Sequence, residues 1–174
     1  MNDRAALAAG LPEEAVLGER DGTYLRQAIA LADKARARGN RPFGALIVGA
    51  DGTVLAEAWN ATGETGDCTA HAETSAVRLA SPAHSREALA DATLYSSAEP
   101  CVMCAGAIFW ANIGRVVYGI DAVRLRVFRG ERADQRDAEL SCRDVFGSSP
   151  HPIDCVGPAL IEESSASHGG AWKI

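Results

Sequence analysis

The sequence has no long apolar run: none approaches the ~20 residues that a helix needs to cross a bilayer. It also has no excess of basic charge, because 17 lysines and arginines stand against 23 acidic residues, a formal net charge of −6 at pH 7. Broad nucleic-acid-binding surfaces usually carry a basic patch. The charge therefore argues against a nucleic-acid partner without excluding a local contact, and we expect no membrane partner.

The start of the chain lacks the order of a secretory signal, since Pro12, Glu13 and Glu14 interrupt an alanine-rich stretch. The cysteines are odd in number, and the five are Cys68, Cys101, Cys104, Cys142 and Cys155. A disulfide framework normally uses an even number in a secreted chain. These features predict a cytoplasmic protein whose cysteines serve metal or redox chemistry.

Neither an internal repeat nor a low-complexity linker divides the chain. We therefore assign residues 1–20 to an N-terminal appendage and residues 21–174 to a single domain. Apolar residues at helical spacing predict a helix over 23–40, and two β-rich runs around Asp51 and Gly52 predict a hairpin.

From residue 71 onward, helical and strand patterns alternate, which is typical of parallel crossovers with helices packed over a sheet. Residues 63–68 read as a loop, and 121–149 as helical in pieces. A short strand and a closing helix are expected over 152–167. The predicted fold is a three-layer α/β/α domain around a mixed sheet of about five strands.

Two cysteines, Cys101 and Cys104, follow Pro100 at the start of the almost uncharged segment "PCVMCAGAIFWANI". Proline suits the first position of a helix, so both thiols would lie one turn apart at the positive end of the helix dipole. Two adjacent thiolates repel each other unless a cation lies between them, and zinc prefers sulfur ligands. A redox-active CxxC pair is the alternative.

His71, in "DCTAHAETSAV", is the candidate third ligand. One imidazole and two thiolates leave a fourth tetrahedral position open, where water binds with its pKa lowered to about 7. Glu73 would then lie close enough to accept and pass on a proton. H-x-E followed by P-C-x-x-C is a known signature of zinc deaminases.

The stretches "TAHAE", "EPCVMCAGAI" and "RVVYGID" resemble the cytidine-deaminase-like superfamily, above all the branch of bacterial guanine deaminases and tRNA adenosine deaminases. The similarity runs from Tyr24 to Asp121 and continues weakly at "PIDCVGPALIEE". It implies a hydrolytic deaminase that holds one Zn²⁺ per chain and releases ammonia. The relatives assemble as dimers or larger oligomers, so the resemblance also implies a homodimer.

Carried over by position, the resemblance makes Glu73 the catalytic proton carrier and His71, Cys101 and Cys104 the zinc ligands. The implied substrate-binding residues are Asn60, Phe43 and Ala72. Simpler explanations stand beside two of them, because asparagine at a strand end often forms a turn and Phe43 enters a strand as a core residue would.

Cys68 occupies a position where the family usually has proline, and it is either a spare ligand or a partly buried thiol without a role. Phe109 and Trp110 are expected in the core. Cys142 and Cys155 are expected to be simple core or surface thiols.

Guanine-type relatives use a later carboxylate at the substrate, and the sequence does not decide among the candidates Glu131, Asp134 and Asp137. A series of arginines surrounds these acids. We expect it to form a solvated helix face, with a phosphate or RNA contact as the alternative. Its members are Arg115, Arg124, Arg126, Arg129, Arg132 and Arg136.

The sequence leaves three functions open. Deamination of a small purine base or nucleoside, guanine first, is favoured by "PFGA", the acidic charge and the absence of a basic tail. A tRNA adenosine deaminase is supported by "CAGAI" and "VVYGID". A non-catalytic zinc module would need a fourth protein ligand such as Cys68.

Overall fold

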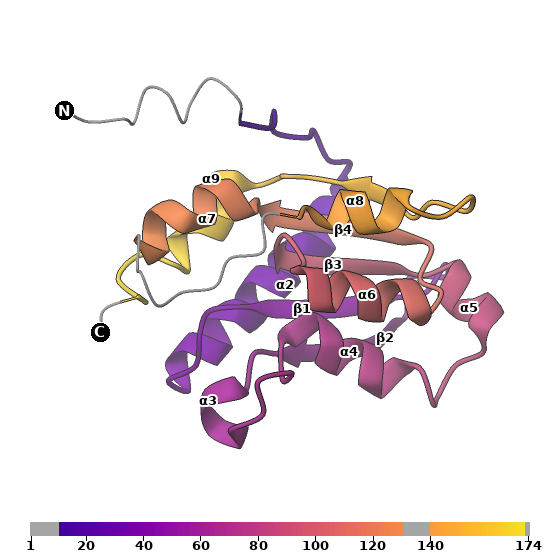
Figure 1. Ribbon diagram of the computed structural model, residues 1–174, viewed down its shortest axis with the longest axis horizontal. Helices are drawn as coiled ribbons and strands as arrows, with labels where there is room; N and C mark the ends of the chain where they lie inside the picture. The colour runs from indigo at the N-terminus through magenta and orange to yellow at the C-terminus, as the bar shows by residue number, and fades with distance from the viewer. Residues whose placement is uncertain (1–10, 131–139, 173–174) are drawn as a thin grey trace.

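A five-stranded mixed sheet forms the centre of the molecule in the computed structural model, which describes residues 11–130 and 140–172 (Figure 1). The strand order is β2-β1-β3-β4-β5. β1 runs antiparallel to β2 and β3, whereas β3, β4 and β5 are parallel. The predicted hairpin thus supplies the antiparallel edge. The strands are β1 (Gly44–Val48), β2 (Val54–Trp59), β3 (Thr93–Ala98), β4 (Arg115–Ile120) and β5 (Asp154–Val156).

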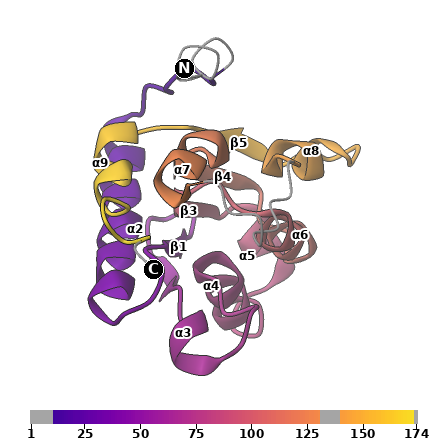
Figure 2. The ribbon, with the colours of Figure 1, turned by 60° about the vertical axis from the view of Figure 1, so that its left-hand side comes forward.

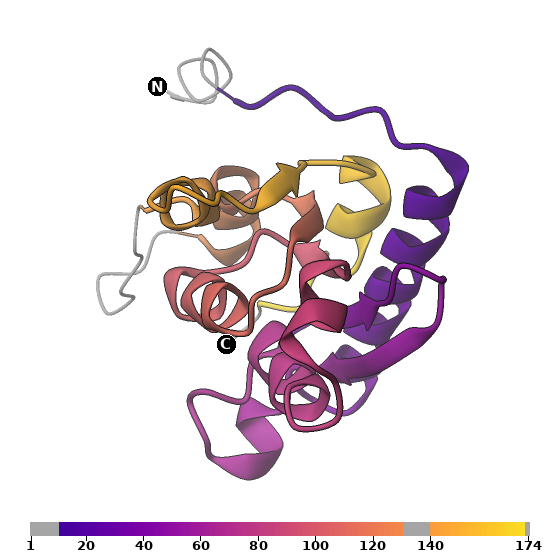
Figure 3. The same ribbon diagram turned by 90° about the vertical axis from the view of Figure 1, so that its right-hand side faces the viewer.

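Helices cover both faces of this sheet, so the predicted three layers are confirmed (Figure 2). One face carries α2 (Glu19–Ala37) and α9 (Ile161–Ala166). The other carries α4 (Ala72–Ala80), α6 (Val102–Trp110) and α8 (Cys142–Gly147). The remaining helices are α3 (Thr62–Thr65), α5 (Arg86–Ala90) and α7 (Ala122–Arg129). Figure 3 shows α2 standing apart from α6 and α8 across the strands. None of the described helices combines the length and apolarity needed to cross a membrane.

The close contact between α2 and β1 depends on Gly44. A Cβ atom there would lie 2.3 Å from the carbonyl oxygen of Ala28 and 2.5 Å from the Ala32 nitrogen. The periodic apolar face of α2 is buried as the sequence pattern predicts, through Leu25, Ala28, Ile29, Ala32 and Ala35. A side chain at position 44 would push this face off the sheet.

Several elements differ from the sequence prediction at their boundaries. The helix expected over 23–40 is α2, which spans Glu19–Ala37. Residues expected to form a loop include the short helix α3, because the side-chain oxygen of Asn40 accepts hydrogen bonds from the backbone N–H groups of Gly63 and Glu64. The helix expected from Pro100 begins at Val102 instead, with Cys101 in extended backbone conformation as its N-cap. The predicted domain boundary at residue 20 stays a prediction.

Trp110 was expected in the core, and this is wrong: 78% of its surface is exposed. Its neighbour Phe109 is only partly buried. α6 is apolar nearly all round, but only the side carrying Cys104, Ala105 and Ile108 faces the interior. Trp110, at the last turn, points outward. The expected homodimer stays a prediction.

We predict that Gly44→Ala lowers the free energy of unfolding by about 1–3 kcal/mol, because the new methyl group overlaps backbone atoms that cannot rotate away. Gly106→Ala is the matched control, since no neighbouring atom lies within 4 Å of the added Cβ and alanine favours a helix. Urea unfolding of both variants measures the difference. An equal decrease in the free energy of unfolding of both variants would contradict the close contact between α2 and β1.

Candidate active site

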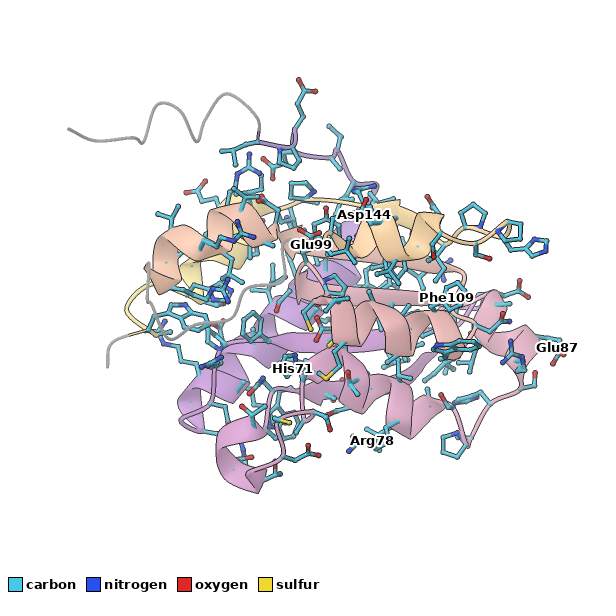
Figure 4. The ribbon with its side chains drawn as sticks, viewed as in Figure 1. His71, Arg78, Glu87, Glu99, Phe109 and Asp144 are labelled. Atoms are coloured by element: carbon cyan, nitrogen blue, oxygen red, sulfur yellow. The ribbon has the colours of Figure 1, made fainter. Side chains whose placement is uncertain are left out.

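Three side chains meet between the starts of α4 and α6. His71 is the N-cap of α4, Cys101 is the N-cap of α6, and Cys104 follows one turn later. The His71 Nδ1 atom lies 3.6 Å from each sulfur, and all three donor atoms lie within 4.8 Å of one another. Figure 4 shows His71 on the side of α4 that faces α6.

This geometry fits a zinc ion. Ligands held tetrahedrally at ~2.3 Å for sulfur and ~2.0 Å for nitrogen would place each sulfur about 3.5 Å from the imidazole nitrogen. The observed 3.6 Å separations agree with that value. One nitrogen and two sulfurs form a donor set that zinc prefers. Among the described residues the cluster consists of His71, Cys101 and Cys104, and Cys68 is not a member.

The surroundings of the cluster favour negatively charged sulfur. Two helix N-termini, those of α4 and α6, bring their positive dipole ends to it. The Cys104 thiol and the His71 imidazole lower the pKa of Cys101 to about 4. The Thr74 hydroxyl lies 3.2 Å from the Cys104 sulfur. Thiolates are the form that binds a metal.

Glu73 lies beside the cluster on the first turn of α4, and only 5% of its surface is exposed. The Ser96 hydroxyl on β3 donates to its Oε1 at 3.1 Å, while its Oε2 lies 3.5 Å from the Cys104 sulfur. Burial, and then the negative charge of Cys101, raise the pKa of its carboxyl group. A carboxylate held in this way is suited to moving a proton next to the metal.

A cavity of about 810 Å³ opens from the cluster, and both His71 and Glu73 line it. Phe43 and Trp172 form part of its wall, with ring centroids 6.0 Å apart in an edge-on arrangement. His168, which is fully buried, stacks against Trp172 at 5.9 Å behind that wall. Phe43 lines the cavity and also packs against the buried cluster that contains Ile120, whereas its role in substrate binding stays a prediction.

Asn60 is 1% exposed and lines the same cavity. Its Oδ1 accepts hydrogen bonds from the backbone N–H and the hydroxyl of Thr62, at 3.3 and 3.0 Å. Because the backbone N–H can only donate, these contacts fix which end of the amide is oxygen. The Nδ2 donor is thereby left for another partner.

Ala72 is fully buried as the first residue of α4, and the described cavity wall does not include its side chain. Its role in substrate binding stays a prediction. Cys68, expected partly buried, is exposed at the cavity rim. Several of the candidates named from the sequence lie outside the described part of the chain: Glu131, Arg132, Asp134, Arg136 and Asp137.

The solvated arginine face is a wrong expectation for the described arginines. Arg115, on β4, forms ion pairs with Asp21 on α2 and with Asp154 on the neighbouring strand β5. Arg126 and Arg129, on α7, are partly buried and line the cavity. The outward side of α7 instead carries apolar side chains, because Val127 and Phe128 are exposed.

Sequence reasoning missed much of the cavity wall, including Trp172 and Glu99. Trp172 lies far from any motif, and an isolated aromatic residue near position 170 was the only available signal. Glu99 directly precedes Pro100, and its carboxylate accepts hydrogen bonds from the start of α7, at the Ala122 N–H, and from the Ser141 hydroxyl before α8. Figure 4 shows Glu99 between these helices, near Asp144.

Comparison with known proteins agrees with this geometry. Residues 18–120 match the family model for the cytidine and deoxycytidylate deaminase zinc-binding region. A probable cytosine deaminase of Schizosaccharomyces pombe is 40% identical over 156 residues, which cover 90% of this chain and 94% of that protein. A guanine deaminase of Bacillus subtilis is 43% identical over 100 residues, covering 57% of this chain and 64% of that protein.

A solved structure from a study of A-to-I editing by tRNA:A34 deaminases superposes with a TM-score of 0.65 and 34% identity, covering 84% of this chain and 99% of that one. The matched family region contains His71, Glu73 and the Cys101–Cys104 pair. The fold, the ligand set and the relatives lead to one conclusion. The chain belongs to the cytidine and deoxycytidylate deaminase family and is a zinc-dependent deaminase.

Proposed function

We propose that the protein hydrolytically deaminates a free nucleobase, with release of ammonia. The observation that carries the proposal is the position of Glu73, buried beside the sulfur ligands and open to one aromatic-walled cavity. A carboxylate in a purely structural zinc site has no reason to occupy such a position.

His71, Cys101 and Cys104 would hold the zinc ion, and the chemistry that zinc would supply is activation of a water for attack on the amine-bearing ring carbon. The residues of the chain supply the rest. Ser96 pins one oxygen of Glu73 by its hydroxyl hydrogen bond, so the other oxygen keeps a fixed direction. Glu73 would take a proton from the attacking water and pass it to the ring nitrogen beside the attacked carbon. It would then carry the remaining hydroxyl proton to the amino group, which departs as ammonia as the carbonyl forms.

The base itself would lie against the cavity wall that Phe43 and Trp172 form together, where their rings offer apolar contact to a flat heterocycle. Asn60 would donate from Nδ2 to a ring nitrogen or carbonyl oxygen, because Thr62 already occupies its Oδ1. Every nucleobase that carries an amino group also has such an acceptor beside it, so this contact orients the base without selecting one.

Two bases have separate support. Cytosine is favoured by the relative described as a probable cytosine deaminase, because that similarity spans nearly the whole of both chains. Guanine is favoured by the "PFGA" stretch containing Phe43 and by the shorter similarity to a guanine deaminase. A nucleoside of either base is a larger variant of the same proposal.

A tRNA substrate is the second candidate, supported by the similarity to the structure associated with tRNA:A34 deaminases and by Arg126 and Arg129 on the cavity wall. Phosphate contacts would make such binding strongly salt-dependent. The non-catalytic zinc module has less support, since the proposed fourth ligand Cys68 lies outside the cluster of ligands.

We predict ammonia release from cytosine or guanine, and a decrease of about 10²–10⁴-fold in kcat for Glu73→Gln, the usual contribution of a general acid–base group. The measurement compares cytosine, guanine, adenine, their nucleosides and a tRNA anticodon hairpin. The zinc content of Glu73→Gln is the control. Activity on the hairpin alone would contradict the free-base proposal, and a fully active Glu73→Gln would contradict the catalytic role of Glu73.

The zinc content of the protein should depend on the three predicted ligands. We predict one Zn²⁺ per chain in the purified protein and almost none in Cys104→Ser, because two remaining donors bind the ion weakly. Cys68→Ser is the matched control and should keep the full metal content, since Cys68 is exposed and outside the cluster. Elemental analysis of both variants measures the number of zinc ions per chain and tests this ligand assignment. Loss of zinc from Cys68→Ser would restore Cys68 as a ligand.

Trp172→Ala should raise KM for the base about fivefold, because removing an aromatic wall costs on the order of 1 kcal/mol of stacking. kcat should change much less, since Trp172 touches neither zinc nor Glu73 in the proposed pose. Trp172→Phe should restore most of the lost affinity. Unchanged KM in Trp172→Ala would show that the base binds elsewhere in the cavity.

A further inference from the structure

Two cysteines that the zinc site does not use lie side by side where α8 packs on β5. Cys142 is the first residue of α8, Cys155 is the middle residue of β5, and their sulfur atoms are 3.9 Å apart. Cys142 is fully buried, whereas Cys155 is partly exposed. Both belong to the described residues outside the zinc cluster.

The environment of the pair makes its two members unequal. Cys155 lines a surface hollow of about 460 Å³ together with Arg143 and Phe146. The hydrogen bond from Cys142 and the charge of Arg143 lower the pKa of the Cys155 thiol. Donation to Cys155, together with burial, raises the pKa of Cys142. A small oxidant entering the hollow thus meets a reactive thiol with a second thiol directly behind it.

We propose that Cys142 and Cys155 form an oxidisable pair, a modification site at which a low-molecular-weight disulfide such as oxidised glutathione produces an intramolecular disulfide. The Cys155 thiolate attacks one sulfur of the oxidant, the S–S bond breaks, and one reduced thiol leaves. The Cys142 thiolate then attacks the Cys155 sulfur, and the second reduced thiol leaves. Two cysteine thiols are oxidised, one disulfide is reduced, and both protons end on the released thiols.

The position of the pair connects this modification to the catalytic cavity. The Cys142 backbone N–H and the Ser141 hydroxyl both donate to Glu99 Oε1, at 3.3 and 2.6 Å. Glu99 lines the cavity and stands two residues before the zinc ligand Cys101. The start of α8, which the disulfide would tie to the sheet edge, is therefore one hydrogen bond from the zinc-binding loop.

The experiment exposes the zinc-loaded protein to a series of oxidised-to-reduced glutathione ratios and maps the cysteines by mass spectrometry. The Cys68→Ser background removes a third thiol, which is exposed. We expect a mass loss of about 2 Da, the two thiol hydrogens, with Cys142 and Cys155 in one linked peptide pair. Zinc content measured at each ratio shows that Cys101 and Cys104 remain bound to the metal.

Cys142→Ser in the same background should trap the intermediate, a glutathione adduct on Cys155 with a mass gain of about 305 Da. Cys155→Ser should leave Cys142 unmodified, because Cys142 is buried. Cys142→Ala repeats the first variant without a buried hydroxyl group, in case serine impairs folding. Free thiols at both positions under strongly oxidising ratios, or a linkage between any other cysteines, would overturn the proposal.

Discussion

Repulsion between two neighbouring thiolates is the constraint on which the site depends. Cys101 and Cys104 are one turn apart, and both can ionise together only if a cation lies between them. The imidazole of His71, from a different helix, would supply the third protein ligand. A zinc ion bound by these residues would therefore hold the start of α4 against the start of α6. The free energy of metal binding would therefore contribute directly to the stability of the packing between these two helices.

The wall of the cavity is built from segments that are distant in sequence. Phe43 precedes β1, Asn60 follows β2, and Trp172 lies beyond α9. The antiparallel pairing of β1 with β2 sets Gly44 opposite Trp59, so the residues flanking that pair come together at the same edge. The Asn60 N–H donates to the Phe43 carbonyl at 2.9 Å, which completes this junction. Strand pairing thus positions Phe43 and Asn60, the two side chains proposed to bind the base.

The sequence predicts the metal centre well because its chemistry is local. Spacing within "HAE" and "PCVMC" determines which donors can share one ion, and the structure brings those donors together. Hairpin turns and alternating apolar patterns predict the sheet for the same reason. Trp110 and Trp172 show where local patterns fail. Whether a tryptophan is buried depends on which distant segments pack over it, and a local sequence pattern does not reveal those tertiary contacts.

The residues that line the cavity fall into two groups, one inside the family region and one beyond it. The family match ends at residue 120 and includes the three zinc ligands, Glu73 and Asn60. Arg126, Arg129 and Trp172 lie beyond it and still line the cavity. The chemistry of deamination needs the first group in any member of the family. In the proposed function, the choice of base would depend on the cavity wall that the second group forms, so similarity confined to the first region does not indicate the substrate. Similarity that continues through α7 and α9 carries more information about the base than higher identity over the core alone.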